Sequence, residues 1–379
     1  MTFQDTYGSG KISCSVGQDT LKLGQSNSIA TPGMLFGMAT SEASVFNNFF
    51  ADGILGLAFP GVAGVIDPST NQPFWVLGKI FLAHPALSPY FSVYMGRALP
   101  HGKVDASGSE LIFGGYDTAL INDQTTVPGT PFVFTDVHPI QRATATTTDN
   151  PSGNPSGKPS ATDGPGFYAW WLVSVHPAVV NAAGELIVDL CDDLSGCFAM
   201  IDTGTSLIAV PKSKFNTLLV GLGKGATVAN GGTTPLQCTT DSSGKQATCD
   251  LCTYDGHDST TLYSCYPSLA IDVPLSSGVH TDRTDGTVST SYQMLLPASD
   301  YFTLTVNENG KPLYLNLQMF ASPSMLSQPT WILGDTFLRR YITRYDIEQT
   351  GEAMNGNDNT IPTVGFATTS GKLALFCLF

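Results

Sequence analysis

Apolar residues in the first part of the chain fall into short runs separated by glycines and polar turns. Residues 3–23 alternate polar and apolar positions around Tyr7-Gly8-Ser9-Gly10, a pattern that predicts a β-hairpin with its turn at these glycines. Further apolar runs at 52–60, 91–95 and 110–115 have the length of strands. The pattern therefore predicts a fold made of many short strands joined by turns.

Two segments show helical spacing instead. Apolar residues recur at intervals of three and four positions across 73–83 and again across 211–222. Pro211 precedes the second segment, and proline is well suited to the first position of a helix. Because helical segments are few, the chain as a whole is expected to be all-β.

The composition changes abruptly in the middle of the chain. Residues 143–166 are rich in Thr, Ser, Pro, Gly, Asn and Asp and contain almost no apolar residues, which is typical of a flexible insertion. The 379 residues, 42% of them hydrophobic, are enough for two packed lobes. We therefore expect a first lobe at 1–142, an insertion at 143–166 and a second lobe at 167–379.

The balance of charge narrows the class of partner. Acidic residues outnumber basic ones 31 to 17, which gives a formal net charge of −14. Nucleic acids and anionic membranes are recognised through basic patches, so this balance argues against both. The carboxylates suit an acidic medium, where protonation removes the surplus negative charge, although a merely soluble acidic surface would have the same composition.

Neither end of the chain predicts a membrane segment. Residues 1–5 lack the basic start and apolar run of a signal peptide. Residues 373–379 are apolar but too short to span a bilayer, and we expect a closing strand or an extension there.

The eight cysteines, an even number, indicate disulfides of a secreted protein. Cys191 and Cys197 flank a short loop and are expected to pair. Four more cysteines form a cluster in which three pairings are possible: Cys238, Cys249, Cys252 and Cys265. A zinc site at Cys249 and Cys252 is the competing interpretation. No second close pair of cysteines or histidines lies at ligand spacing, so we expect no metal.

A short internal repeat relates the two halves. Ile54-Leu55-Gly56 recurs as Ile332-Leu333-Gly334, and such a weak duplication is typical of a two-lobed protein. In the second half this tripeptide has a counterpart far upstream, Asp202-Thr203-Gly204, which follows two apolar residues. The glycine lets the backbone turn sharply and leaves the carboxylate exposed at a loop tip.

The ordered series of motifs resembles the pepsin family of aspartic peptidases, whose lobes each thread an Asp-Thr/Ser-Gly loop past an apolar-apolar-Gly strand. The matching segments follow in the family's order: 7–10, 36–40, 52–58, 113–115, 191–197, 201–207, 331–335 and 364–367. The resemblance implies an all-β, bilobal pepsin-like fold with Asp202 as a catalytic residue. It also implies substrate-binding roles for a flap made of Tyr7, Gly8 and Ser9 and for the loop residues Gly204, Thr205 and Ser206. Neither a metal nor an organic cofactor is implied.

The family mechanism needs two facing carboxylates that share one proton. The first half contains no Asp-Thr-Gly or Asp-Ser-Gly, and Asp52 and Asp335, which head no such loop, are interpreted as structural. By the family's spacing the first loop would precede Met1. The resemblance thus implies an incomplete first lobe and a truncated form of an acid endopeptidase, secreted or in an acidic vacuole, that is inactive by itself.

Two other interpretations remain open. One is a non-catalytic pseudoprotease that binds extended peptides without cleaving them. The other is a homodimer that pairs two Asp202 loops. The expected form is a monomer that acts on polypeptide substrates, with no nucleic-acid or membrane partner.

Overall fold

The computed structural model describes sixteen stretches of the chain: residues 2–7, 10–24, 28–48, 51–62, 65–96, 108–121, 131–140, 168–191, 196–229, 235–252, 262–276, 280–281, 288–323, 326, 329–347 and 361–369. The chain divides into two compact units. Unit 1 comprises residues 1–89, 139–171 and 349–360, and unit 2 comprises 90–138, 172–348 and 361–379. Within the described stretches, no helix has both the length and the apolar composition needed to cross a bilayer.

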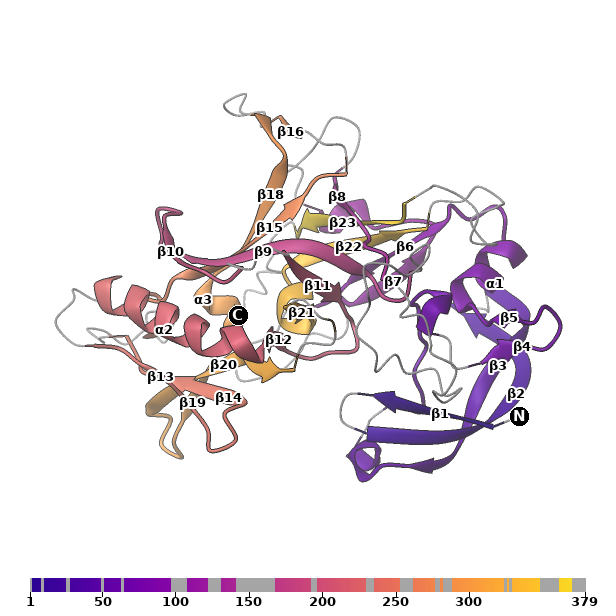
Figure 1. Cartoon of the computed structure of the whole chain (residues 1–379), viewed down its shortest axis with the longest axis horizontal. Coiled ribbons are helices and arrows are strands. Elements are labelled where there is room, and N and C mark those ends of the chain that lie inside the picture. Colours follow the sequence, from indigo (N-terminus) through magenta and orange to yellow (C-terminus); the bar gives the residue numbers. More distant parts are fainter. Residues whose placement is uncertain are drawn as a thin grey trace, which may run out of the picture. The chain divides into compact units, whose positions relative to one another are not determined.

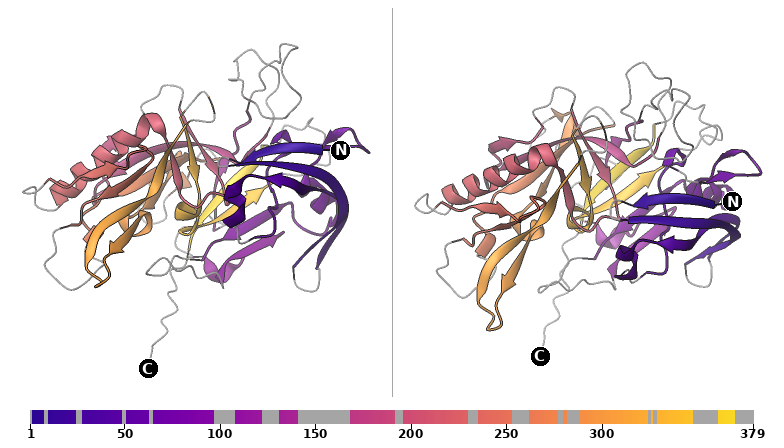
Figure 2. Two further views of the ribbon diagram at one scale, coloured as in Figure 1. Left: turned by 90° about the horizontal axis from the view of Figure 1, so that it is seen from below. Right: turned by 60° about the horizontal axis from the view of Figure 1, so that its bottom comes forward.

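Unit 1 contains a three-stranded antiparallel sheet, drawn in indigo and purple in Figure 1. Its strands are β1 (Thr2–Tyr7), β2 (Gly10–Leu23) and β3 (Ile29–Glu42), in that order across the sheet. Tyr7 pairs with Gly10 across the first turn, which confirms the hairpin predicted from the alternating pattern. The two views of Figure 2 show the three strands side by side.

The other described elements of unit 1 are short: η2 (Ser44–Asn48), η3 (Pro60–Val62), β4 (Ile66–Asp67), β5 (Gln72–Pro73) and α1 (Val76–Ala83). Helix α1 confirms the helix predicted at 73–83, with Leu77 and Ile80 fully buried. An aromatic group anchors the segment that leads to it. Phe59 packs on Trp171 with ring centroids 4.4 Å apart, and the Trp171 indole donates a hydrogen bond to the Leu57 carbonyl at 2.9 Å.

The apolar run at 52–60 does not form the predicted strand. Residues 53–57 have no regular secondary structure, and Ile54 and Leu55 are 53% and 38% exposed. A strand needs a neighbour to satisfy its backbone groups, and the described part of unit 1 places none beside this run. The local pattern was therefore right about apolar character and wrong about the strand.

Unit 2 is built on an eleven-stranded mixed sheet. Across the sheet its strands are β13 (Cys238–Thr240), β14 (Gln246–Cys249), β20 (Pro312–Ser322), β12 (Ile208–Pro211), β21 (Thr330–Leu333), β11 (Cys197–Ile201), β9 (Leu172–Val180), β15 (Ser268–Pro274) and β18 (Ser291–Leu296), with β10 (Leu186–Asp189) beside β9 and β19 (Phe302–Val306) beside β20. The small hairpin β16 (His280–Thr281) and β17 (Val288–Ser289) and the short helices α3 (Ala298–Tyr301) and α4 (Asp335–Leu338) complete this part.

Helix α2 (Lys212–Ala229) packs against β9, β10, β12, β13 and β20 of this sheet (Figure 1). It begins one residue after Pro211, as the apolar spacing predicts, but continues seven residues beyond Leu222. Glycines in its second half interrupt the apolar pattern, which hid this extension from the sequence. They allow close contact instead: a side chain at Gly223 would meet the Leu236 carbonyl oxygen at 2.7 Å, and one at Gly225 would meet Pro267 at 2.9 Å.

A five-stranded antiparallel sheet completes unit 2, with the order β7 (Glu110–Phe113), β6 (Tyr90–Tyr94), β22 (Tyr341–Asp346), β23 (Thr363–Thr368) and β8 (Val133–Asp136); η6 (Thr118–Leu120) follows β7. Strands β6 and β7 confirm the runs predicted at 91–95 and 110–115. The sequence assigned them to the first lobe, at 1–142. Strand β6 belongs to unit 2 because it pairs with β22, and β7 pairs with β6. Strand β8 belongs there because it pairs with β23. These pairings join distant parts of the chain. The predicted insertion at 143–166 and the apolar tail at 373–379 lie outside the described residues.

All disulfides found among the described residues lie in unit 2. Cys191 pairs with Cys197, as expected from their spacing. In the downstream cluster Cys238 pairs with Cys249 across β13 and β14, and Cys252 pairs with Cys265. All four cluster cysteines are therefore held in disulfides, including the two that could have formed a zinc site.

Candidate active site

Asp202 lies at the end of a completely buried strand. All five residues of β11 are buried, and β11 runs parallel to β21, with Ile201 opposite Leu333. The pairing continues one step into the loop, because the Asp202 amide donates to the Leu333 carbonyl at 3.2 Å. The rigid strand pair thus fixes the position from which the carboxylate emerges.

Two donors of the same loop hold the Asp202 carboxylate. The Gly204 amide donates to Oδ1 at 2.9 Å, and the Thr205 hydroxyl donates to Oδ2 at 2.6 Å. The Thr205 amide also donates to the Asp202 carbonyl at 3.3 Å, which closes the turn. Each carboxylate oxygen therefore has a fixed donor, the kind of support that a reacting group needs. The Ser206 side chain is exposed, and its backbone carbonyl accepts a hydrogen bond from the Thr336 hydroxyl at 3.3 Å.

The second copy of the internal repeat supports this loop from behind. Gly334 is buried against it so closely that a Cβ atom at this position would overlap the carbonyl oxygens of Thr205 and Leu207. The next amide, of Asp335, donates to the Thr205 carbonyl at 2.8 Å. Glycine is required here because the backbones of two segments meet without room for a side chain.

Asp335 is electrostatically linked to Asp202. Burial raises the pKa of the Asp335 carboxyl, the Arg339 guanidinium, 3.5 Å away, opposes that rise, and the charge on Asp202 adds to it. The sequence identified Asp335 only as structural. Its position directly after the apolar-apolar-Gly motif was the signal that it lies near the Asp202 loop.

The residues predicted to form the flap belong to unit 1. Tyr7 ends β1 in unit 1, and Gly8 and Ser9 lie outside the described residues. Asp202 belongs to unit 2. Closure of Tyr7 over Asp202 therefore stays a prediction, as do the substrate-binding roles of Gly204, Thr205 and Ser206.

Among the described residues, no loop packs on the first copy of the repeat. A Cβ atom added at Gly53 or Gly56 would meet no atom within 4 Å, in contrast to Gly334. Among the described residues of unit 1, therefore, nothing occupies the place that the Asp202 loop occupies beside the second copy.

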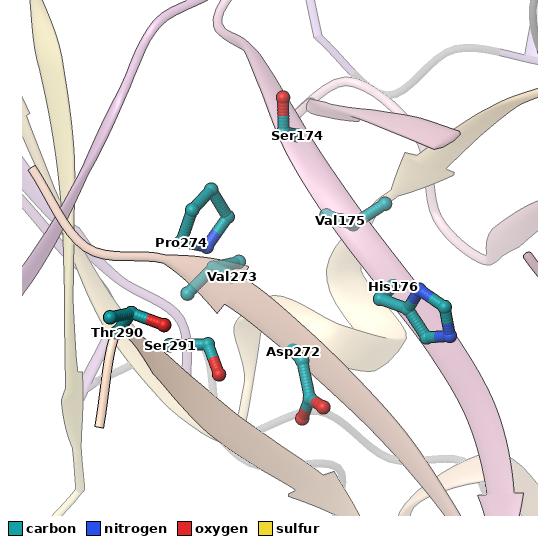
Figure 3. A pocket seen from close by; sticks show the side chains of 8 residues that line it. All are labelled: Ser174, Val175, His176, Asp272, Val273, Pro274, Thr290 and Ser291. Carbon is teal, nitrogen blue, oxygen red and sulfur yellow. The ribbon is translucent and has the colours of Figure 1, made fainter. Parts of the chain in front are cut away.

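A separate open cavity of about 360 Å³ lies on strands β9, β15 and β18 of unit 2; it is lined by Ser174, Val175, His176, Asp272, Val273, Pro274, Thr290 and Ser291 (Figure 3). His176 and Asp272 lie opposite each other on adjacent strands. Nε2 of His176 is 3.0 Å from the Asp189 carboxylate, and Oδ1 of Asp272 is buried with no hydrogen-bond partner among the described residues. The sequence analysis did not identify these residues. In the part of the chain that the structure describes, no group of three or more His, Cys, Asp or Glu side chains could hold a metal ion.

An aspartic-peptidase lobe is defined here by three features: β11 parallel to β21, the hydrogen-bonded Asp202 loop and the close contact at Gly334. Comparison with known proteins gives the family. The family model "Eukaryotic aspartyl protease" matches residues 1–133 and 169–353, so the chain belongs to the eukaryotic aspartyl protease family.

Individual relatives agree with this assignment. Gastricsin of Macaca fuscata fuscata and gastricsin of Homo sapiens are each 26% identical over 379 aligned residues, which cover 97% of this chain and 69% and 67% of those proteins. Pepsin B of Canis lupus familiaris is 24% identical over 347 residues, covering 91% of this chain and 64% of its own length. The chain thus spans about two-thirds of the length of these relatives.

A solved structure supports the fold. The aspartic proteinase from Irpex lacteus superposes with a TM-score of 0.57 at 19% identity, covering 98% of this chain and 82% of that one. The expected all-β, bilobal pepsin-like fold is confirmed.

Proposed function

We propose that Asp202 is one half of the carboxylate pair of an acid endopeptidase, and that this chain by itself does not hydrolyse peptide bonds. The observation that carries the proposal is the Asp202 loop, in which donors at 2.6 and 2.9 Å hold both carboxylate oxygens. The sequence contains no second Asp-Thr-Gly or Asp-Ser-Gly.

The reaction needs two carboxylates in different protonation states. The ionised one takes a proton from a water molecule, which attacks the peptide carbonyl carbon. The protonated one donates to the carbonyl oxygen and stabilises the tetrahedral intermediate. Because the shared proton belongs to the pair, a lone Asp202 can take neither role efficiently.

The complete enzyme would act on polypeptides, between apolar residues and at acidic pH, in a secreted or acidic vacuolar setting. The gastricsin and pepsin B relatives and the surplus of carboxylates support this. The hairpin tip Tyr7-Gly8-Ser9 would cover the substrate, and Gly204, Thr205 and Ser206 would line the site.

The test compares two proteins on an apolar peptide at about pH 3–5: this chain, and the same chain preceded by the genomic sequence upstream of Met1. We expect turnover only from the longer protein, provided that the upstream sequence encodes an apolar-apolar-Asp-Thr/Ser-Gly segment in frame. Asp202→Asn should then lower its kcat by at least ~100-fold, a typical contribution of general acid–base catalysis. Turnover that survives Asp202→Asn would refute the assignment of Asp202.

The two alternatives give different outcomes of the same assay. A pseudoprotease, which the single Asp-Thr-Gly favours, would bind the peptide without cleaving it even when the upstream sequence is present. A homodimer that pairs two Asp202 loops would be active as this chain alone, with specific activity that rises with protein concentration.

A further inference from the structure

The open cavity in unit 2 shares no lining residue with the Asp202 loop and has charged groups of its own. It lies on β9, β15 and β18, and its volume of about 360 Å³ is near the lower end of the range of about 300–1,000 Å³ for small-ligand sites. Figure 3 shows the His176 ring and the Asp272 carboxylate next to each other on adjacent strands, with Ser174 farther along β9. The cavity is therefore charged at the end where His176 and Asp272 lie.

The two carboxylates near His176 differ in their hydrogen bonds. Asp189 Oδ1 accepts a hydrogen bond from the Cys191 amide at 2.8 Å and lies 3.0 Å from His176 Nε2. The Oδ1 atom of Asp272 is buried, and no hydrogen-bond partner for it lies among the described residues. A carboxylate that loses water without gaining a donor is costly, so such a group needs an explanation. In the described part of the chain, Asp272 is the carboxylate of this cavity that lacks a partner.

The cavity carries negative charge whatever the state of the imidazole. With Asp189 and Asp272 ionised and at most one positive charge on His176, the three groups sum to −1 or −2. The described lining residues include no Lys or Arg. A cation is therefore favoured, because opposite charges attract strongly at a partly buried site. A metal ion is not, because the described residues contain no group of three His, Cys, Asp or Glu side chains that could hold one.

The buried oxygen of Asp272 restricts the shape of that cation. Because Oδ1 is buried while the residue as a whole is partly exposed, a ligand in the cavity meets Oδ2. A guanidinium binds a carboxylate best through two parallel hydrogen bonds, which need both oxygens. A primary ammonium is a compact charge with three donors, so it can bond Oδ2 together with the lining hydroxyls of Ser174 or Thr290. The exposed ring of Pro274 offers an apolar surface to a hydrocarbon stem (Figure 3).

We propose that this cavity binds a primary ammonium group on an alkyl stem, as carried by a lysine side chain of a second polypeptide. The ammonium supplies the donor that Asp272 lacks, and the stem lies along Pro274. A free alkylamine has the same chemistry, so the experiment below separates the two sources. The proposed site is independent of Asp202 and of peptide hydrolysis.

The experiment titrates the ¹⁵N-labelled full chain with three ammonium probes and follows its amide resonances. The probes are n-butylamine, Nα-acetyl-lysine amide and a short uncharged peptide with one central lysine, all at low ionic strength because salt screens the attraction. We expect shifts confined to residues 174–176, 272–273 and 290–291, with a Kd of about 1–10 mM for a contact that rests on one ion pair.

The decisive variant is Asp272→Asn, which removes the charge and keeps the shape. It should weaken binding of each probe by about tenfold or more, because a hydrogen bond to a charged group is lost. Glu308→Gln is the matched control: it changes the net charge by the same unit in the exposed turn between β19 and β20, and it should bind as the parent does. Should Asp272→Asn fail to fold, judged by circular dichroism, Ser174→Lys replaces it. A lysine placed inside the cavity would occupy the site and abolish binding.

Tighter binding of the lysine peptide than of n-butylamine would identify a polypeptide as the source of the ammonium, and equal affinities would identify a free amine. Four results would overturn the proposal: no shifts with any probe, equal binding of the uncharged Nε-acetyl-lysine analogue, binding of Nα-acetyl-arginine amide as tight as that of its lysine counterpart, or equal weakening by Glu308→Gln. Loss of binding on Asp202→Asn would also contradict it, because the probes would then be bound at the Asp202 loop.

Discussion

The same tripeptide has opposite surroundings in the two units. In unit 2, Leu333 is 1% exposed and Gly334 touches the backbone of the Asp202 loop. In unit 1, Leu55 is 38% exposed and Gly56 faces open space. An apolar-apolar-Gly motif therefore does not form a strand by itself. The motif forms a buried strand when a loop with its own flanking strands packs on it.

Substituting the glycine of each copy should give the largest difference in the free energy of unfolding between the two units. Gly334→Ala places a methyl group onto the Thr205 carbonyl oxygen, and we expect a loss of more than about 4 kcal/mol in the free energy of unfolding. Gly56→Ala should change it by no more than about 0.5 kcal/mol, because the space is open. Urea unfolding measures both. Equal losses at the two positions would mean that the copies have similar surroundings.

Substituting the leucine of each copy should give the next largest difference in the free energy of unfolding. Leu333→Ala removes a fully buried side chain and should cost about 2–5 kcal/mol. Leu55→Ala should cost less than about 1 kcal/mol, because much of the side chain already contacts water. If an added upstream segment raised the cost of Leu55→Ala toward that of Leu333→Ala, that segment would pack on the first copy of the repeat. An unchanged cost would contradict that interpretation.

Asp67 stabilises unit 1 in its ionised form, above its lowered pKa. The Ser69 hydroxyl and amide and the Lys79 ammonium bind its carboxylate at 2.6, 2.9 and 3.1 Å and lower its pKa to about 2. A lowered pKa adds stability above the unfolded value that is lost as pH falls through about 2. Asp67→Asn should therefore cost about 1–2 kcal/mol at pH 5–7 and almost nothing at pH 2, measured by thermal unfolding. The exposed Glu308→Gln is the control, and a cost independent of pH would contradict the assignment.

Substitution of Asp335 should have the smallest effect on the free energy of unfolding, and it should stabilise the protein where the other substitutions destabilise it. Its raised pKa means that its stabilising contribution is complete at low pH and is lost as pH rises through the folded value. Asp335→Asn should therefore gain stability relative to the parent chain toward neutral pH, by less than about 1 kcal/mol because the ion pair with Arg339 is also lost. Arg339→Gln should lose stability over the same range. If the free energies of unfolding of both variants changed with pH in parallel, the raised pKa of Asp335 would be contradicted.

The sequence predicted best where local pattern and packing agree. The hairpin at Tyr7–Gly10 has a period of two and helix α1 a period near 3.6, while β6 and β7 are apolar runs of strand length, and each is observed. Asp202 was found because its motif stands in an ordered series. The donors to its carboxylate, Gly204 and Thr205, lie in the same short loop, where the resemblance implied substrate-binding residues.

Contacts between distant segments decided the rest. The assignment of β6, β7 and β8 to unit 2 depends on pairing with β22 and β23, more than two hundred residues later, which no local period reveals. The influence of Asp202 on Asp335 depends on β11 lying beside β21. The pocket at His176 and Asp272 likewise needs two strands to become neighbours.

The three disulfides in the described part of the chain have a consequence if the protein is exposed to proteases. Each links cysteines only 6, 11 or 13 positions apart, and all lie in unit 2. A single cut inside any of these loops leaves both fragments covalently tethered. Such a nicked molecule would migrate near full mass on a denaturing gel without reductant, and the cut would separate the fragments only after the disulfide is reduced.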